Sequence, residues 1–171
     1  NIASGKYFYW INSGDYLLDD NSVQRLMNVL NIKNFEWVIC RIAISKFDNK
    51  PKVYFPLIYP QWIIRNGHAN NCFWGFLQQE NTVFTKELYF RVDGINPNFK
   101  MAGDYDLWKR FAKFAKLVSL NIKFASHRKS DNQLTVIKKY YDEIGKKQCI
   151  LNIFYPLRLI FSLIYYPFLE K

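Results

Sequence analysis

The run Met101–Arg110 constrains the fold of this chain more than any other stretch. It follows a loop rich in glycine, asparagine and proline at positions 93–98. Apolar residues then recur at three- and four-residue spacing, which places them on one face of a helix: Leu107, Phe111, Phe114 and Ala115. Asp104 therefore sits at or just before the first helical turn, where free backbone N–H groups and the helix dipole favour an ionised carboxylate.

Asp104 is a candidate for two different roles. A carboxylate on a rigid element can take a proton from an attacking hydroxyl, so Asp104 is a candidate general base. Aspartate is also a preferred helix-capping residue, and Asp106 suits the first turn equally well. Taken alone, the run favours capping, and only the other polar stretches of the chain make catalysis the better interpretation.

Composition limits the class of protein. The 171 residues are 50% hydrophobic and 19% aromatic, which predicts one domain with a real core and argues against disorder. The formal charge of +10 indicates an anionic partner, namely nucleic acid, a membrane surface or a phosphorylated small molecule. The basic residues are scattered from Lys6 to Lys171 without a nucleic-acid-binding motif, so we do not expect nucleic acid to be the partner.

The cysteines and the start of the chain bear on its compartment. The three cysteines are odd in number and widely spaced, which predicts neither a disulfide framework nor a metal knuckle and favours a reducing compartment. The given residues contain no stretch of signal-peptide type, so we do not expect one in this part of the chain. The chain opens on Asn1 without an initiator methionine, so we expect the true N-terminus to lie upstream.

The aromatic run Lys6–Ile11 predicts a buried strand that ends in the polar turn Asn12–Asp15. Open α/β sheets bind ligands where their central strands end. Asp15 is thus a candidate ligand for a divalent metal or a sugar hydroxyl, because hard cations prefer oxygen donors. The alternative is a plain turn without chemistry.

Two further stretches carry candidate site residues. In Phe73–Phe84, three polar residues at positions 78–80 stand between apolar flanks. If they are buried, their polar groups need partners, and a bound polyhydroxylated ligand could supply them. The alternative is an edge strand with a solvated face. Alternation predicts a strand at 117–124, which leads into Ser126–Lys129. There a histidine could ligate metal and two cations could face phosphates, and a solvated basic turn is the alternative.

The remaining elements follow from periodicity and capping signals. We expect helices after the caps at 19–22, near 61–64, from 85 to Gly94 and over 133–144, with strands at 37–44 and 53–55.

The tail is almost wholly apolar from Cys149 to Leu169. An interior arginine and two prolines argue against a membrane-spanning helix. An interfacial helix fits better, with Arg158 reaching toward water and Tyr155, Tyr165 and Tyr166 as anchors. A last helix packed on the domain or on a partner subunit is the alternative. We therefore divide the chain into a domain at 1–145 and a C-terminal helical tail at 146–171.

Four runs, in this order along the chain, resemble the family-2 glycosyltransferases, inverting enzymes with the GT-A nucleotide-sugar fold. The runs are Gly5–Leu18, Gln78–Phe84, Ala102–Phe111 and Phe124–Thr135. Each motif is weak alone, but the ordered set is fairly specific and covers about residues 1–145. The resemblance implies an α/β fold, a GT-A-like mixed sheet flanked by helices.

The resemblance also implies a reaction, the transfer of a sugar from a nucleotide-activated donor to a hydroxyl of a glycan or lipid-linked acceptor, with inversion. It implies Mg²⁺ or Mn²⁺ as cofactor. We expect the site to comprise Asp104 as catalytic base, Asn12, Ser13, Asp15, Arg128 and Lys129 at the donor diphosphate, Gln79, Glu80 and Trp108 at the acceptor, and Asp15 with His127 at the metal.

Two departures from the family pattern matter. Asn12 and Gly14 stand where the family usually has an aspartate at one or both positions, which weakens the expected metal site. About four residues precede the first matching run, whereas the family begins with a nucleotide-binding βαβ half. We expect one of two cases: a complete chain would lack the pocket for the base and uridine, and a fragment, inactive alone, would come from an intact enzyme that carries this half upstream. The alternatives are a non-catalytic GT-A-like binding or scaffold protein and a basic membrane-surface interaction module.

The resemblance points to surface polysaccharide or glycolipid synthesis at the cytoplasmic face of the membrane. We expect peripheral membrane contact through residues 149–169, and an oligomer is compatible with the sequence.

Overall fold

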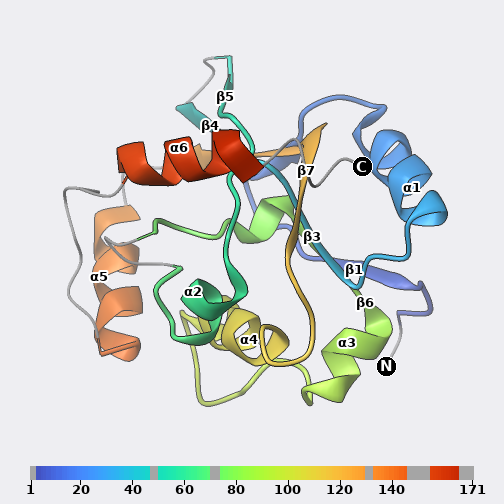
Figure 1. Cartoon of the computed structure of the whole chain (residues 1–171). Coiled ribbons are helices and arrows are strands. Elements are labelled where there is room, and N and C mark those ends of the chain that lie inside the picture. Colours follow the sequence, from blue (N-terminus) through green and yellow to red (C-terminus); the bar gives the residue numbers. More distant parts are fainter. Residues whose placement is uncertain (1–2, 47–49, 70–73, 130–132, 146–154, 166–171) are drawn as a thin grey trace.

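The computed structural model describes residues 3–46, 50–69, 74–129, 133–145 and 155–165 (Figure 1). Two mixed four-stranded sheets form its centre. The first sheet has the order β1 (Tyr7–Tyr9), β6 (Thr82–Thr85), β3 (Trp37–Arg41) and β7 (Val118–Lys123). The second has the order β2 (Tyr16–Leu17), β8 (Ala125–Lys129), β4 (Ala43–Lys46) and β5 (Lys52–Val53). The mixed α/β class expected from the sequence is confirmed.

The two sheets share two chain segments. β3 continues into β4 after Ile42, and β7 continues into β8 after Phe124. The pairs β3–β7 and β4–β8 are both parallel, so these segments run side by side through both sheets. The bends at Ile42 and Phe124 carry β8 out of the first sheet, so that the described strands on its two sides are β2 and β4.

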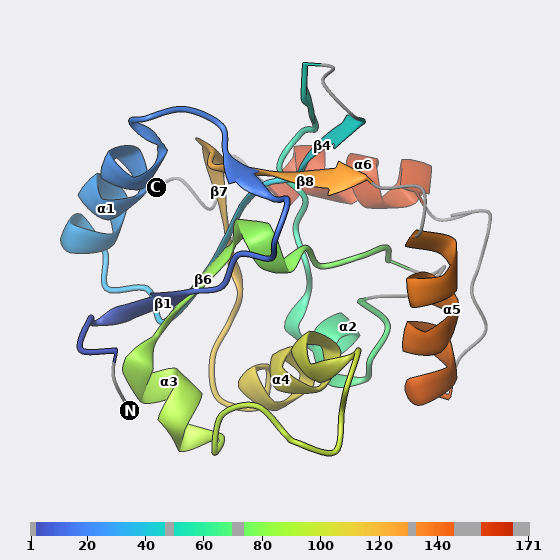
Figure 2. The same ribbon diagram turned by 180° about the vertical axis from the view of Figure 1, so that it is seen from behind.

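Helices surround the sheets (Figures 1 and 2). They are α1 (Ser22–Ile32), α2 (Gln61–Arg65), α3 (Lys86–Arg91), α4 (Gly103–Phe111), α5 (Gln133–Glu143), α6 (Tyr155–Tyr165) and the 3₁₀ turn η1 (Gln79–Asn81). The helices predicted at 22, 61, 85, 104 and 133 are therefore present. Thr85 caps α3 by accepting a hydrogen bond from the Leu88 N–H, and Gly94 ends that segment with a φ of +65°.

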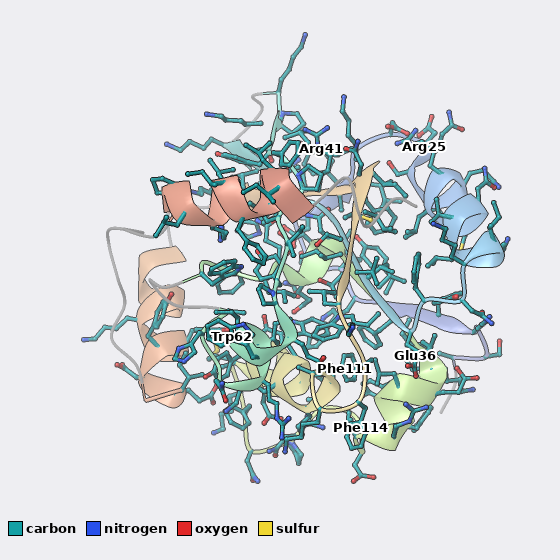
Figure 3. All side chains as sticks on the ribbon, in the orientation of Figure 1. Arg25, Glu36, Arg41, Trp62, Phe111 and Phe114 are labelled. Atoms are coloured by element: carbon teal, nitrogen blue, oxygen red, sulfur yellow. The ribbon has the colours of Figure 1, made fainter. Side chains whose placement is uncertain are left out.

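Alternate residues of β3 supply the two halves of the core. Trp37 and Ile39 pack with α2 and α4, whereas Val38 and Cys40 pack with Leu26 of α1 and its neighbours. In the larger half the Trp37 and Trp108 rings stack with centroids 5.6 Å apart. Figure 3 shows Phe111 toward the middle of the molecule and Phe114 near its rim. Phe114, expected on the buried face, is 54% exposed because α4 ends at Phe111.

β1 differs from the buried central strand that the aromatic run predicts. It pairs with β6 on one side, and no other described strand lies on its second side. Its side chains are half-buried, and Trp10 and Ile11 after it are exposed. The interior places of the first sheet belong to β6 and β3, whose residues are almost all buried.

The polar stretch at 78–80 is not an extended strand. Gln78 accepts hydrogen bonds at its backbone carbonyl from the Thr82 hydroxyl (2.7 Å) and at its side-chain carbonyl from the Asn81 amide (3.2 Å). These local bonds satisfy the buried polar groups in a tight 3₁₀ turn, which a strand could not do. The edge-strand alternative is also wrong, because β6 after the turn is paired on both sides.

Residues 126–129, for which a solvated basic turn was the alternative to a metal- and phosphate-binding segment, belong to β8 and do not form a turn. Residues Ile44, Ser45 and Lys46 of β4 pair with residues 127–129, and β2 pairs on the other side. Strand pairing with two distant segments overrides the local polarity of this run.

Within the described parts of the chain, no helix has both the length and the apolar content needed to cross a membrane. The predicted reach of Arg158 toward water is wrong. Arg158 is buried and donates a hydrogen bond to the Trp74 carbonyl, because α6 packs on the segments around residues 58 and 74. Tyr155 and Tyr165 are within α6 but their side chains, like Tyr166, lie outside what the structure describes.

Candidate functional site

Three residues from separate parts of the chain meet at one point. Asp15 follows the turn after β1, Glu80 lies in η1, and His127 lies on β8. Their ligand atoms all lie within 4.8 Å of one another. His127 Nδ1 is 3.2 Å from Asp15 Oδ1 and 3.8 Å from Glu80 Oε1. The sequence predicted Asp15 and His127 as metal ligands, and the fold brings them together with Glu80.

The turn before Asp15 fixes the position of its carboxylate. The Asp15 N–H donates to the Asn12 carbonyl at 3.1 Å, and Gly14 takes a φ of +94° that other residues rarely adopt. Asp15 Oδ1 accepts a hydrogen bond from the Arg128 N–H at 3.0 Å. With a side chain only 4% exposed, Asp15 is held between the turn and β8.

Glu80 is tied to the same turn through its neighbours. The Tyr9 hydroxyl donates to the Glu80 carbonyl at 3.1 Å. The Gln79 amide donates to Asn12 Oδ1 at 3.3 Å and to the Trp10 carbonyl at 3.4 Å. Gln79, expected at the acceptor, thus also joins η1 to the turn and so fixes Glu80 relative to Asp15.

The pKa of Glu80 is raised, as is typical of a buried carboxyl group without a neutralising cation. Burial is the main cause that raises its pKa from 4.5 to about 7, and the charges of Asp15 and Asp104 add to the rise. His127 opposes that rise. In turn, the hydrogen bond to Asp15 raises the pKa of His127.

Two buried oxygens in this group are left over for a ligand. Among the described residues, Asp15 Oδ2 and Glu80 Oε1 have no hydrogen-bond donor. Buried carboxylate oxygens without a donor are costly unless something else satisfies them. Adjacent ligands of an octahedral ion at about 2.1 Å lie roughly 3 Å apart, close to the 3.2 and 3.8 Å separations seen here. Two carboxylates and an imidazole fit a divalent ion, and carboxylate ligands suit both Mg²⁺ and Mn²⁺.

Asp104 lies in the first turn of α4, as predicted, but it does not cap the helix. Ala102 is the cap residue, without a side-chain capping bond, and Asp104 Oδ1 accepts from the adjacent Tyr105 N–H at 2.7 Å. Asp104 is 7% exposed, and burial raises the pKa of its carboxyl from 3.8 to about 7. The charge of Asp104 also contributes to the raised pKa of Glu80.

The sequence reasoning missed Glu143, at the end of α5. Its carboxylate accepts hydrogen bonds from the N–H groups of Lys100 (2.7 Å), Met101 (2.8 Å) and Ala102 (2.6 Å), the loop that leads into Asp104. These bonds lower the pKa of Glu143. Some forty residues separate the partners, and an acidic residue near a helix end carries no pattern that would have revealed them.

We expect Glu143→Ala to loosen the start of α4. Three backbone donors lose their acceptor at once, so the variant should melt at a lower temperature than the parent. Because the pKa of Glu143 is lower in the folded chain, its stabilisation is complete above about 4.5 and fades as the pH falls below that value. Thermal unfolding at pH 7.5 and at pH 3.5 measures this, and equal losses at both would contradict it. Asp142→Ala, an exposed neighbour, is the matched control.

The expected diphosphate contacts are at the surface near this group. Asn12, Ser13, Arg128 and Lys129 are exposed. The Arg128 guanidinium lies over the Tyr16 ring at 5.3 Å. The polar side chains of the turn and of β8 next to Asp15 are therefore accessible to solvent.

The predicted role of Trp108 as an acceptor contact is wrong. It was expected to present its ring to an acceptor sugar, yet it is 2% exposed and its ring stacks on Trp37 and contacts Phe84 and Phe111. The helical spacing that puts Leu107 and Phe111 in the core also turns Trp108 inward.

A hollow among the described residues lies away from this group. It has a volume of about 770 Å³ and lies along β1 and α3, where Tyr7, Trp10 and Phe90 are among the residues that line it. None of Asp15, Glu80, Asp104 or His127 lines this hollow, so the residue chemistry and not cavity size identifies the site.

Comparison with known proteins supports the fold. No protein-family profile and no curated protein matches this chain. Among solved structures, the fragment TarS 1-349 of S. aureus matches with a TM-score of 0.51 and 12% identity, over 84% of this chain and 42% of that one. The same fragment in complex with UDP-GlcNAc matches with a TM-score of 0.51 and 11% identity, over 83% and 43%. The chain thus spans less than half of these structures, and it has a glycosyltransferase-like fold.

Proposed function

We propose that this chain carries the catalytic and metal-binding part of an inverting glycosyltransferase that uses a nucleotide-activated sugar. The observation that supports the proposal best is the meeting of Asp15, Glu80 and His127 beside a buried Asp104, in a glycosyltransferase-like fold. A scaffold protein would gain nothing from burying three carboxyl groups together, since each costs stability unless a ligand compensates it.

In this proposal Asp104 is the general base. As the acceptor hydroxyl attacks the anomeric carbon, Asp104 takes its proton, the new C–O bond forms, and the bond to the diphosphate breaks on the opposite face. A base works best when its pKa lies near the working pH, and burial brings the Asp104 pKa to about 7. The helix start holds this carboxyl in place while it gains and loses its proton.

Asp15, Glu80 and His127 would hold the divalent metal. Such an ion supplies positive charge to the departing diphosphate. This arrangement favours Glu80 as a ligand rather than as an acceptor contact, because its free oxygen faces His127. Asn12, Ser13, Arg128 and Lys129 would contact the diphosphate from the surrounding surface, and Gln79 would keep the turn and η1 together.

The donor and the acceptor belong to the proposal as well. TarS was crystallised with UDP-GlcNAc, which makes UDP-GlcNAc the first donor to test. The acceptor would be a hydroxyl of a glycan or of a lipid-linked sugar in surface polysaccharide or glycolipid synthesis.

Titration calorimetry tests the metal and diphosphate site directly, with UDP and inorganic diphosphate as probes. We expect Mn²⁺ to strengthen the binding of both by at least about tenfold, because the ion would link the three ligands to the phosphate oxygens. His127→Ala should abolish that gain, whereas His68→Ala, which removes a half-buried histidine outside this group, should leave it unchanged. Binding that is indifferent to Mn²⁺ would contradict the proposal, and Mn²⁺-dependent binding without sugar transfer from UDP-GlcNAc to any acceptor would favour the scaffold alternative.

A further inference from the structure

α6 is oriented with its polar residues inward. Arg158 is 5% exposed and bonds to the Trp74 carbonyl, and the fully buried Ser162 hydroxyl accepts from the Ile58 N–H at 3.0 Å. The Phe161 ring contacts the Trp74 ring edge-on, with centroids 5.7 Å apart. The arginine and the serine therefore attach this helix to the domain.

Among the described side chains of α6, those on its outward face are apolar. Its large side chains are each more than half exposed, and we call them the apolar stripe: Leu157 (59%), Ile160 (53%), Leu163 (56%) and Ile164 (58%). At about 100° per residue these positions fall within one arc of the helix. A helix that faces water carries its polar residues outward, so this reversed arrangement indicates a non-aqueous neighbour.

Cations lie next to this helix at the same end of the molecule. Lys46 on β4, Lys50, and Lys52 on β5 are exposed, and we call them the basic hairpin. Both views place α6 beside β4 at that end (Figures 1 and 2). Ile58 follows β5 by only a few residues, and its N–H is hydrogen-bonded to the Ser162 hydroxyl of α6. The described strands of the second sheet contain no acidic residue. In the sequence the segment 46–52 holds these three lysines and one acidic residue, Asp48, so it keeps a net charge of +2.

We propose that the apolar stripe and the basic hairpin together form a docking surface for an anionic lipid membrane. α6 would lie in the plane of the interface, with the stripe at the boundary between headgroups and acyl chains and the lysines among anionic headgroups. A second copy is the less suitable occupant. Each chain carries a net charge of +10, so pairing two such faces would bring like charges together. This inference does not depend on the proposed sugar transfer.

Vesicle flotation with the full chain tests the proposal. We expect binding to vesicles of phosphatidylcholine with about 30% phosphatidylglycerol, and weak binding to phosphatidylcholine alone. Replacing Leu157, Ile160 and Ile164 with serine should lower the partition coefficient at least about tenfold, since binding scales with the apolar area that enters the interface. Neutralising Lys46, Lys50 and Lys52 with glutamine should lower it by up to about fivefold per cation, an effect that added salt should reproduce.

The controls separate docking from general stickiness. Ile32→Ser and Phe114→Ser remove apolar side chains that are 82% and 54% exposed on other faces, and both should bind like the parent. Circular dichroism and melting temperature establish that each variant is folded, and the single change Ile164→Ser replaces the triple variant should that one unfold. Two outcomes would overturn the proposal. One is vesicle binding that stays unchanged when the apolar stripe is replaced. The other is a parent chain that does not bind vesicles but forms a dimer in light scattering, if replacing the stripe dissociates that dimer.

Discussion

In the intact enzyme, Asp104→Asn is expected to lower sugar transfer by about a hundredfold to ten-thousandfold, the usual contribution of a general base. Asparagine keeps the size of the side chain and can still accept the Tyr105 N–H, but it cannot take a proton. Binding of the nucleotide sugar should therefore be retained, so that the loss falls on the turnover rate. Initial rates and calorimetry on the same preparation measure both quantities.

The same variant should be more stable than the parent at high pH. The pKa of Asp104 is about 7 in the folded chain against an ordinary 3.8, so ionising it in place opposes folding. The penalty is absent below about 3.8, grows through the interval up to 7 and is complete above 7. Asp104→Asn removes this penalty. The free energy of unfolding should therefore rise by up to about 4 kcal/mol at pH 8 and change little at pH 4.

Asp106→Asn is the matched control for Asp104. Asp106 lies on the same helical turn and pairs with Arg110 at 2.7 Å, so its loss disturbs an ion pair but no proposed catalytic group. We expect near-normal transfer from this variant. Near-normal transfer from Asp104→Asn as well would remove Asp104 from the mechanism, and a melting temperature that shows no pH-dependent gain would contradict the burial argument.

The second large effect concerns the metal. At a Mn²⁺ concentration about a hundredfold above its dissociation constant, an ion that binds only the folded chain adds about 2.7 kcal/mol to the free energy of unfolding. We expect this gain in the parent, and its near-complete loss in Asp15→Asn and in Glu80→Gln. Denaturant unfolding with and without Mn²⁺ gives the difference directly, without any activity assay.

Without metal, Glu80→Gln should leave the chain at least as stable as the parent above pH 7, because it removes a buried charge whose pKa is raised to about 7. Glu87 is an exposed acidic residue on α3. Glu87→Gln should change neither the free energy of unfolding without metal nor the gain from Mn²⁺. A gain from Mn²⁺ that survives in both Asp15→Asn and Glu80→Gln would show that the ion binds elsewhere.

How far the sequence could predict this molecule depended on how local each signal was. The helix at Asp104 and the cap at Thr85 follow from spacing and side-chain chemistry within one or two turns, and both are present. The tight turn at 79–81 and the strand at 125–129 could not be predicted in this way. One depends on a network around Gln78, and the other on pairing with β2 and β4.

The site shows the same division. Residue type and chain order were enough to propose Asp15, Asp104 and His127 as candidates, because metal ligands and bases are limited to a few side chains. They could not tell that Glu80 faces His127 or that Glu143 holds the loop before Asp104. Both contacts join residues more than forty positions apart. Trp108 illustrates the opposite error, since an aromatic residue suited to a sugar also suits a core.

The bends at Ile42 and Phe124 have a consequence for how this protein can change. His127 faces Asp15 and Glu80 because it lies three residues beyond Phe124 on a segment whose earlier half is locked into the core. Adding or deleting one residue there would exchange inward and outward positions along β8 and turn Arg128 or Ser126 toward Asp15. Surface turns of this chain can vary in length, whereas these two joints must keep their residue count for Asp15, Glu80 and His127, the proposed metal ligands, to meet.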